Sequence, residues 1–585
     1  MRSLSNALNA EIGKTVQVSG WVNSRRDHGG LIFIDLRDHT GIIQLVITPD
    51  APKAFAVAEG LRDEFVISAT GLVRERAPEL KNPNISTGDI EIVVDNLTLI
   101  NRSEPLPVNT HDEGDPSGEE LRLKYRFLDL RRPSMQNILR RRAEFYRIMR
   151  QYMDEHDFIE ITTPILANSS PEGARDFLVP SRLHAGKFYA LPQAPQQFKQ
   201  LLMVGGVPRY YQIAPCFRDE DPRADRLYGD FYQLDCEMSF VDDGEVVRQT
   251  MEPLIKKLVK DFAGKTLVNE DVPRLTYREA MERYGTDKPD LRYGLELIDL
   301  TEALKDCEFK VFQTPCVKAI RVSGGSKFTR KQIDEFTELA RKNGAGGLAY
   351  ILYENGTVRS PIAKFLKDSE LAEIQKLTGA EDGDAVFFGA DLRQNVNKVL
   401  GQMRIAFADT LGLKNPQEVA LCWIVDFPLY EQDEATGKID FCHNPFSMPN
   451  GGLKALRETE NKLDIIADQY DMAMNGLELC SGAVRNYDPE ITYEAFRILG
   501  YSREEVAKRF SGMLNAFKFG APPHAGCAFG LDRMLMELLD TDSIRDVVAF
   551  PKNGSGVDLM MDSPSVVDDS QLEDVHLAIV KEDEQ

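Results

Sequence analysis

The chain has 585 residues and a formal net charge of −23, so it exceeds the size of one hydrophobic core and lacks the bulk positive charge of proteins that coat nucleic acid. It has no run of about 18 apolar residues and no apolar segment at its start, which argues against a transmembrane helix and against secretion. Eight cysteines without a CxxC pair argue against a zinc site and a disulfide framework, and they suit a reducing cytoplasm. From the length we expect about three or four domains.

Five short alternating runs of apolar and polar residues occupy the first part of the chain. They begin near Val16, Leu31, Ile42, Glu64 and Asp89, with Gly and Pro between them. Alternation with a period of two predicts strands, and five strands in this length predict a small closed barrel. We expect an OB-fold β-barrel over residues 1–105, and a generic β-barrel of another role is the alternative.

A polar stretch at 101–120, rich in Pro, Asp, Glu and Gly, predicts a linker, which we assign to 106–140. A basic helix is expected to begin after Pro133, a residue that suits a first helical turn. The run FIEITTPIL then predicts a strand that ends near Pro164.

The remaining chain predicts a main domain that is split by an insertion. Strands and helices alternate in 141–290 and again in 419–560, with many Gly and Pro breaks. The Lys- and Glu-rich segment between them, 291–418, predicts an inserted α+β domain with helices at Lys331–Asn343 and Asp368–Leu377. Residues 561–585 are assigned to a C-terminal extension. The expected fold class is therefore multidomain α/β and β.

The densest polar segment is FRDEDPRADRLYGDFYQLDCE at Phe217–Glu237, where arginines and carboxylates lie between two runs that predict strands. An arginine at the base of such a hairpin, Arg218, presents a planar fork of donors that matches phosphate oxygens. Ordinary mixed charge at an exposed hairpin tip is the alternative.

A second candidate is GAPPHAGCAFGLDR at Gly520–Arg533, which precedes an amphipathic helix. Its glycines let the backbone approach a ligand, and Arg533 comes at the start of the helix. The chain has neither GxxxxGK[ST] nor a strand–GxGxxG–helix unit, so Walker-type and Rossmann nucleotide sites are unsupported.

These motifs resemble those of class II aminoacyl-tRNA synthetases: FRDED resembles motif 2, GLDR resembles motif 3, and FIEITTPIL resembles motif 1. The stretches SSPEGARDFLVPSR, QAPQQFKQLLM, CHNPFSMP and PPHAGCAFGLDR narrow the likeness to bacterial-type aspartyl-tRNA synthetase, over essentially the whole chain. FFGADLRQNVNKVLGQMR resembles that family's extra domain between motifs 2 and 3. The resemblance implies an OB-fold anticodon-binding domain, a class II catalytic domain built on an antiparallel sheet with helices, and an inserted domain of unassigned role.

The resemblance also implies a two-step reaction, in which aspartate and ATP form aspartyl-adenylate and the aspartyl group then moves to the 3′ end of tRNA. Arginines and Mg²⁺ would neutralise the phosphate charge. By resemblance Arg218 and Arg533 are catalytic, and the ATP-binding residues are Arg218, Asp219, Glu220, Phe231, Glu478, Gly530, Leu531, Asp532 and Arg533. Mg²⁺ would bind Asp471 and Glu478, which lie on one helix face if DMAMNGLE is helical, and otherwise at a helix end and the following strand.

Aspartate would bind, by the same resemblance, to Glu172, Gln196, Lys199, Arg218, Gln233, Asp235, His443 and Arg485. Lys199 and Arg485 would hold the side-chain carboxylate, and Asp235 would face the ammonium group. Two cations around one carboxylate select an acid over its amide, because the amide leaves a buried cation poorly paired. The related asparaginyl enzymes lack a lysine at the place of Lys199, so this residue favours aspartate.

The chain departs from the family's pattern at three places. After the first arginine of motif 2 it has RADRLYGDF, one residue longer than the usual segment, with Leu227 where the family has a glutamine near ATP. Asn444 stands where the family has a second histidine, and Ala194 replaces a serine. We expect ligand contacts at these positions to differ from those of the family.

The turn RRDHGG concerns the choice of tRNA. By resemblance Arg26, His28, Phe33, Gln44 and Glu91 contact the anticodon, with Phe33 as the stacking platform. Family members confined to tRNA(Asp) commonly have leucine at the place of His28, so a histidine resembles the non-discriminating kind that also charges tRNA(Asn). A solvent-exposed turn histidine in a tRNA(Asp)-specific enzyme is the alternative.

Three further functions compete: an asparaginyl or lysyl synthetase, a ligase paralogue that does not use tRNA, and an OB-fold nucleic-acid binding protein without catalysis. Lys199 with Arg485 opposes the first, the N-terminal barrel opposes the second, and the complete motifs 2 and 3 oppose the third. Motif 1 builds a dimer interface in the family, so the resemblance implies a homodimer.

Overall fold

The computed structural model describes residues 2–113, 117–169, 174–433 and 436–580. It divides into two compact units, Met1–Asn137 and Ile138–Gln585, and each has a hydrophobic core of its own. No helix in the described part of the chain is long and apolar enough to cross a membrane. All eight cysteines are unpaired, as their spacing predicts.

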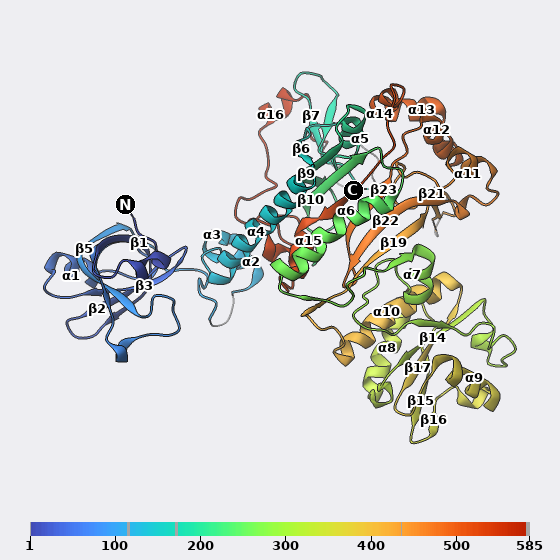
Figure 1. The fold of residues 1–585 in the computed structure, drawn as a ribbon, viewed down its shortest axis with the longest axis horizontal. Coiled ribbons are helices and arrows are strands. Elements are labelled where there is room, and N and C mark those ends of the chain that lie inside the picture. The colour runs from blue at the N-terminus through green and yellow to red at the C-terminus, as the bar shows by residue number, and fades with distance from the viewer. Residues whose placement is uncertain (1, 114–116, 170–173, 434–435, 581–585) are drawn as a thin grey trace. The chain divides into compact units, whose positions relative to one another are not determined.

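The first unit contains a closed five-stranded barrel, which confirms the predicted OB-fold class (Figure 1). The order around the barrel is β1-β2-β3-β5-β4. Its elements are β1 Thr15–Asp27, β2 Ile32–Asp38, β3 Gly41–Ile47, α1 Pro52–Glu59, β4 Val66–Glu75 and β5 Ile90–Asn101. The period of two explains the barrel: Ile32, Ile34 and Leu36 point into its core and are at most 1% exposed, whereas Phe33 alternates to the outer side.

The predicted linker is irregular in its first part, helical in its second, and held to the barrel by a buried carboxylate. Its described residues 106–113 and 117–118 form no helix or strand, and α2 Glu119–Lys124, α3 Arg126–Asp129 and the start of α4 (Pro133–Glu155) follow. Glu64, beside β4, is 2% exposed and accepts hydrogen bonds at 2.7 Å from Arg37 of β2 and from Arg131 after α3. The same carboxylate therefore ties the barrel to the helical end of the linker.

The second unit is built on an eight-stranded sheet of order β12-β19-β22-β23-β24-β10-β9-β6. Its strands are β6 Ile159–Glu160, β9 Arg209–Arg218, β10 Gly229–Ser239, β12 Arg274–Thr276, β19 Leu421–Pro428, β22 Ile466–Met474, β23 Leu477–Val484 and β24 His524–Gly530. The six inner strands run antiparallel to one another, and the edge strands β12 and β6 pair in parallel with β19 and β9. This is the antiparallel sheet with helices that the sequence predicts.

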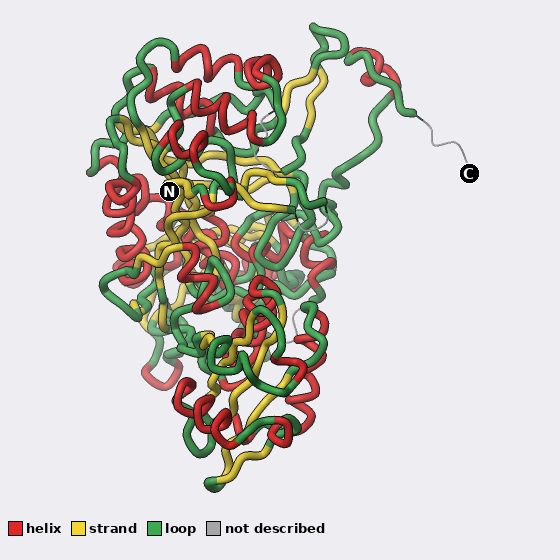
Figure 2. The backbone as a smooth tube through the Cα atoms, turned by 90° about the vertical axis from the view of Figure 1, so that its right-hand side faces the viewer, coloured by secondary structure: helices red, strands yellow, loops and turns green. Residues whose placement is uncertain are grey.

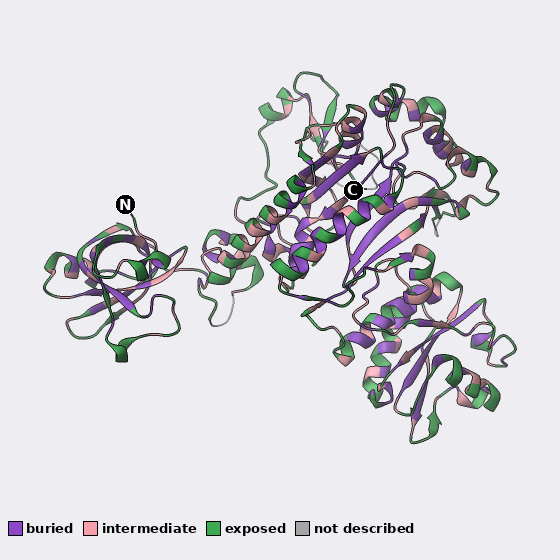
Figure 3. Cartoon of the chain, in the orientation of Figure 1, coloured by how far each residue is buried: buried purple, intermediate pink, exposed green. Residues whose placement is uncertain are grey.

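Three helices cover one face of this sheet: α4 Pro133–Glu155, α6 Gly244–Lys257 and α15 Leu531–Leu538. Phe145 of α4, Met251 of α6 and Leu535 of α15 are fully buried in one core with Leu234 and Cys236 of β10. Figure 3 shows these strands and the inner sides of the helices as buried. Because side chains alternate along a strand, Gln233 and Asp235 of β10 face the other side of the sheet.

Shorter elements complete the second unit. They are β7 Leu178–Pro180, β8 Phe188–Ala190, α5 Gln196–Val204, β11 Thr266–Leu267, α7 Tyr277–Tyr284, β18 Glu418–Val419, β20 Tyr430–Gln432, β21 Ile439–Phe441, α11 Gly452–Glu458, α12 Pro489–Ile498, α13 Arg503–Arg509, α14 Ser511–Phe517 and α16 Asp569–Asp574. Before α16, residues 548–568 contain no helix or strand and run as the loop seen in Figure 2.

The strand predicted from FIEITTPIL is much shorter than expected. Only Ile159–Glu160 forms β6, and the last backbone hydrogen bond of the run goes from Ile161 to Tyr211. Pro164 has no N–H to donate and also disfavours regular conformations in the residue before it. The apolar run therefore continues as irregular chain.

The residues predicted to form the inserted domain hold a separate five-stranded sheet of order β13-β14-β17-β15-β16. Its elements are β13 Leu297–Asp299, β14 Cys316–Val322, α8 Arg330–Lys342, β15 Ala349–Glu354, β16 Thr357–Arg359, α9 Asp368–Thr378, β17 Ala385–Asp391 and α10 Arg393–Leu411. The predicted helices correspond to α8 and α9. Phe387 packs with α8 and α10 and Phe388 with α9, so successive residues of β17 serve cores on opposite faces.

Candidate active site

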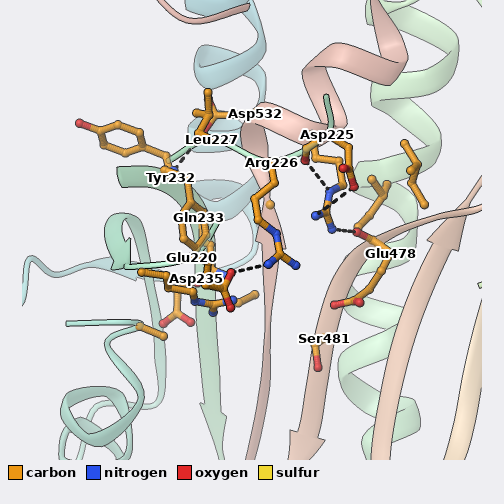
Figure 4. Close-up of a pocket in the computed structure, with 18 of the residues that line it drawn as sticks. Glu220, Asp225, Arg226, Leu227, Tyr232, Gln233, Asp235, Glu478, Ser481 and Asp532 are labelled. Carbon is orange, nitrogen blue, oxygen red and sulfur yellow. Dashed lines mark hydrogen bonds and ion pairs between the residues drawn. The ribbon is translucent and has the colours of Figure 1, made fainter. Parts of the chain in front are cut away.

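A cavity of about 480 Å³ lies on the sheet face opposite to the core of α4, α6 and α15. Strand β10 lines it with Phe231, Gln233 and Asp235, which alternate with the core residues Leu234 and Cys236. Figure 4 shows Gln233 and Asp235 on this side, with Glu478 and Ser481 of β23 nearby. The predicted motif 2 hairpin and the strand before motif 3 thus share one cavity.

Small residues of β24 leave the space for this cavity and for the acid beneath it. In the strand register Gly530, Ala528 and Gly526 lie opposite Gln233, Asp235 and Glu237. A Cβ atom at Gly526 would lie 2.2 Å from Glu237 Oε2 and 2.1 Å from the Cys236 carbonyl oxygen. Only glycine fits there while Glu237 keeps its place.

Four charged side chains form a buried network beneath the cavity: Lys199, Asp235, Glu237 and Arg485. Lys199 Nζ lies 2.7 Å from Asp235 Oδ1 and 3.2 Å from Glu237 Oε2. Arg485 Nε donates to Glu237 Oε1 at 3.0 Å. Each side chain is at most 5% exposed, so two cations and two carboxylates neutralise each other away from water.

The pKa shifts follow from burial and from these pairings. Burial alone would lower the pKa of Lys199, but Asp235 and Glu237 raise it above its ordinary value. Burial raises the pKa of Asp235, and Lys199 offsets part of that rise. Burial alone would raise the pKa of Glu237, but Arg485 and Lys199 bring it below its ordinary value. A substrate carboxylate at this place would therefore be a third one, and it would share Lys199 and Arg485 with Asp235 and Glu237.

Glu237 is a residue that the sequence analysis missed. It lies two positions after Asp235 on β10, so it faces the same side, and it contacts both Lys199 and Arg485. The signal that could have found it was the alternation of polar residues in FYQLDCE within a predicted strand.

The opposite end of the cavity holds cations that contact nearby acids. Arg218, the last residue of β9, lies with its guanidinium carbon 5.0 Å from the Phe231 ring centroid, and its buried Nε has no hydrogen-bond partner among the described residues. Arg226 donates to Glu220 at 2.6 Å, as Figure 4 shows. Arginine forks at this place match the oxygens of a phosphate chain.

Arg533 of motif 3 contacts two other segments of the cavity wall, strand β23 and the motif 2 loop. It occupies the first turn of α15 and donates to the carbonyl oxygen of Glu478 at 2.8 Å. Its Nη2 lies 3.6 Å from Asp225 Oδ2 in the motif 2 loop. Arg226 and Asp225 were not predicted as site residues, although both belong to the charged segment that the sequence singled out.

The acidic pair lies on a β-hairpin, so both placements expected from its spacing are wrong. Asp471 is on β22 and Glu478 is on β23, and the turn between these strands is Asn475–Gly476. Both turn residues have positive φ, of 52° and 91°, which is the geometry of a tight hairpin turn. The Asn-Gly pair between two apolar runs was the overlooked signal.

Asp471 and Glu478 have the donor chemistry that suits a divalent cation. Asp471 Oδ1 is buried without a hydrogen-bond partner among the described residues. Burial raises the pKa of Asp471 well above its ordinary value, and the charge of Glu478 raises it further. The described residues contain no group of three or more His, Cys, Asp and Glu side chains for a metal. A pair of carboxylates still suits Mg²⁺, which keeps several waters and binds substrate phosphates.

Most of the predicted aspartate and ATP residues line this cavity. They are Gln196, Lys199, Arg218, Glu220, Phe231, Gln233, Asp235, His443, Glu478, Arg485, Gly530, Asp532 and Arg533. Burial lowers the pKa of His443, and Glu478 offsets part of that shift. The Asp532 carboxylate accepts a hydrogen bond from the Tyr232 N–H at 3.1 Å and pairs with Arg142 at 2.6 Å, so it supports the cavity wall.

Three described residues of the predicted set are not among the lining side chains. Asp471 is buried, Leu531 lies in the helix-covered core, and Asp219 accepts a hydrogen bond from Tyr228 at 3.3 Å. Glu172 lies outside the described residues. The three departures from the family pattern, Leu227, Asn444 and Ala194, all line the cavity.

In the barrel of the first unit, the predicted anticodon residues form a connected polar and aromatic face. Arg26 donates to Gln44 at 3.3 Å, and Gln44 donates to Glu91 at 3.1 Å. The Phe33 ring packs edge-to-face against His28, with 5.6 Å between centroids. His28 is exposed and begins the Gly29–Gly30 turn, in which its N–H donates to the Leu31 carbonyl at 2.9 Å.

Two family models match the chain. Residues 118–554 match "tRNA synthetases class II (D, K and N)", and residues 16–100 match "OB-fold nucleic acid binding domain". The second match covers the closed barrel, and the first covers the whole cavity.

Close relatives and solved structures are similar over nearly the full length. The chain is 53% identical over 570 residues to an aspartate–tRNA(Asp/Asn) ligase from Pelodictyon phaeoclathratiforme, covering 97% of this chain and 94% of the relative. It is 51% identical to an aspartate–tRNA ligase from Streptomyces avermitilis, covering 98% and 97%. An aspartyl-tRNA synthetase structure from Entamoeba histolytica shares the fold, with a TM-score of 0.57, 19% identity and coverage of 94% and 92%.

Proposed function

The chain belongs to the class II tRNA synthetases for D, K and N, and we propose that its cavity activates L-aspartate with ATP and passes the aspartyl group to tRNA. It is an aspartate–tRNA ligase, the activity named for relatives about half identical to it over almost the whole chain. The observation that carries this function is the buried network of Lys199, Asp235, Glu237 and Arg485 beneath the cavity.

This network supports recognition of aspartate rather than asparagine. Lys199 and Arg485 offer the side-chain carboxylate of the substrate two cations that cannot turn to water, because both are almost fully buried. An amide in that place would leave a buried cation poorly paired. We assign Asp235 to the substrate ammonium group and Arg218 to the α-carboxylate. Gln196, Gln233, His443 and Glu172 complete the proposed aspartate set.

Adenylate formation needs charge neutralisation and alignment more than covalent help from the protein. An oxygen of the aspartate α-carboxylate forms a bond to the α-phosphorus of ATP, and the bond from that phosphorus to the bridging oxygen breaks. The electron pair leaves with pyrophosphate. Arg218 stabilises the charge that develops between the two reactants, and Phe231 stacks on adenine. Arg533 holds the far phosphate end, and Glu220 and Asp219 lie on the nucleotide side. Gly530, Leu531 and Asp532, at the junction of β24 and α15, complete the proposed ATP set.

Asp471 and Glu478 would hold Mg²⁺, which when bound neutralises phosphate charge. The protein's own part is to keep two carboxylates together on a rigid hairpin, in spite of their repulsion. In the second half-reaction the ribose hydroxyl at the 3′ end of tRNA attacks the aspartyl carbonyl, and AMP leaves.

The range of tRNAs is the finer part of the proposal. We assign Arg26, Phe33, Gln44 and Glu91 to anticodon contacts and His28 to tolerance of tRNA(Asn) beside tRNA(Asp). Relatives at 53% and 51% identity have names that differ in this respect, so overall similarity does not separate the two kinds. The exposed His28 ring beside Phe33 supports a role next to the stacking base. A tRNA(Asp)-specific enzyme is the alternative.

Three further assignments come from the sequence. We propose that the enzyme works in the cytoplasm and, by the family resemblance, forms a homodimer through motif 1, the chain around β6, where Ile159, Ile165 and Leu166 are 47–51% exposed. The domains are those assigned from the sequence: 1–105, 106–140, 141–290 with 419–560, 291–418 and 561–585.

ATP–pyrophosphate exchange with aspartate, asparagine and lysine tests the proposed activation step. Exchange that depends on aspartate alone supports it, and exchange that prefers asparagine or lysine would remove it. Aminoacylation of tRNA(Asp) and tRNA(Asn) transcripts tests the range of tRNAs. Comparable charging of both supports the non-discriminating form, and a strong preference for tRNA(Asp) that persists in His28→Leu contradicts it.

A further inference from the structure

The chain passes from the main domain into the inserted domain through residues 285–294, which we call the root segment. This segment is tightly packed against α10. Gly285 ends α7 with φ 69°, and a Cβ atom there would lie 2.2 Å from the Asn397 carbonyl oxygen of α10. A Cβ atom at Gly401 would lie 2.7 Å from the Gly285 carbonyl oxygen. The root segment and α10 therefore meet backbone to backbone.

A buried arginine fixes the rest of the root segment. Arg404 of α10 is 1% exposed and donates to the carbonyl oxygens of Asp290 at 2.6 Å, Tyr293 at 2.9 Å and Gly294 at 3.2 Å. Its guanidinium carbon also lies 4.4 Å from the Tyr293 ring centroid. Three carbonyl contacts to one rigid guanidinium hold this backbone in a single path.

The path leads the root segment along the acidic hairpin of the active site. A Cβ atom at Gly476, in the hairpin turn, would lie 3.5 Å from Asp290 Cβ and 3.9 Å from the Lys288 carbonyl oxygen. Glu478 is two residues beyond this turn. The root segment therefore runs beside the hairpin that carries the carboxylates proposed to hold Mg²⁺.

Lys288 of the root segment lines the catalytic cavity. Its Nζ lies 3.9 Å from Glu478 Oε2 and 3.7 Å from Asp287 Oδ1, and the side chain is 44% exposed. Both distances exceed hydrogen-bond length, and such exposed pairs contribute little. The Lys288 ammonium is therefore loosely held at the acidic end of the cavity and can take a stronger anionic partner.

We propose that Lys288 binds the pyrophosphate portion of ATP and of the leaving group, and that α10 of the inserted domain, by fixing the root segment, holds this positioning residue at the active site. The proposal rests on the proposed function. When a cation occupies Glu478, that carboxylate no longer neutralises Lys288, and the β- and γ-phosphate oxygens are the anions that replace it. Lys288 donates hydrogen bonds from a charged group and transfers no proton or electron pair.

Direct binding to the full-length protein tests this assignment by titration calorimetry with magnesium pyrophosphate, ATP and AMP. AMP lacks the β- and γ-phosphates, so it reports on the rest of the site. Lys288→Met keeps the side-chain stem and removes the charge, and it should weaken pyrophosphate and ATP binding about tenfold while changing AMP binding less than about twofold. Lys288→Arg should restore most of the loss.

Lys376→Met is the matched control, since Lys376 is an exposed lysine of α9 that pairs with Glu373 and does not line the cavity. It should bind all three ligands as the unmodified protein does. Equal pyrophosphate binding by Lys288→Met and the unmodified protein would overturn the proposal, and so would an equal loss of AMP binding. Aspartate-dependent exchange by the unmodified protein is measured in parallel, so failure of the proposed function is seen separately from failure of this role for Lys288.

Discussion

The catalytic cavity and the barrel face use the same kinds of ion pair in opposite surroundings. Lys199 and Asp235 lie 2.7 Å apart with side chains at most 2% exposed, whereas Arg26 and Asp35 of the barrel lie 3.0 Å apart with side chains 48% and 18% exposed. A buried pair loses several kcal/mol when one partner is removed, and an exposed pair loses about 1 kcal/mol or less. Burial, more than the number of contacts, decides where a substitution is severe.

The largest effect is expected where a side chain would displace the buried network itself. Gly526→Ala places a Cβ atom against Glu237 and the β10 backbone, neither of which can move freely. We expect loss of aspartate-dependent exchange and a thermal midpoint lower by about 5 °C or more. Gly512→Ala is the control, because a Cβ atom there meets nothing within 4 Å. A Gly526→Ala protein that keeps full exchange would show that the network tolerates displacement.

Removing one charge from the network comes next. Lys199→Met leaves Asp235 and Glu237 to share Arg485, and it removes one of the two cations proposed for the substrate carboxylate. The value of kcat/KM for aspartate should fall about a thousandfold in the exchange assay. Lys376→Met should change it little. A loss smaller than tenfold would place aspartate selection elsewhere in the cavity.

On the barrel, the stacking ring should matter more than any single polar contact. Phe33→Ala should raise KM for tRNA about tenfold, because stacking of one base on an aromatic ring contributes roughly 1–3 kcal/mol. Exchange without tRNA should be unchanged, which separates the barrel from the cavity. Leu31→Ala, at an exposed position just before β2, is the control. Equal tRNA KM values for the two variants would argue against Phe33 as the platform.

The smallest effect belongs to His28. Its ring contacts Phe33 and is otherwise exposed, so His28→Leu should leave the barrel fold and tRNA(Asp) charging intact. The ratio of tRNA(Asn) to tRNA(Asp) charging should fall about fivefold, which corresponds to roughly 1 kcal/mol. An unchanged ratio would assign the choice of tRNA to other positions.

Local patterns predicted the elements that have one buried face. The barrel strands, α8 and α9 follow from periods of two and 3.6, and the base of the motif 2 hairpin follows from its flanking strands. FIEITTPIL failed as a long strand because Pro164 ends the pairing, and DMAMNGLE was misjudged because its Asn-Gly turn was overlooked.

Contacts between distant segments of the chain could not be predicted in this way. Glu237 becomes part of the site through Arg485, 248 residues away, and Lys288 reaches Glu478 only because α10 fixes the root segment. The local periodicity of apolar residues does not predict contacts between segments that are far apart in the sequence. The resemblance to a family predicted which residues contact ligands, but it did not include Glu237, the buried acid that pairs with Lys199 and Arg485.

The ratio of kcat/KM for aspartate to that for asparagine, measured by ATP–pyrophosphate exchange on the unmodified protein, tests the central claim most directly. A site with two buried cations facing one carboxylate should prefer the acid by a factor of about 10⁴ or more, because the amide leaves a buried charge unpaired. A ratio near one would contradict the role assigned to the network of Lys199, Asp235, Glu237 and Arg485.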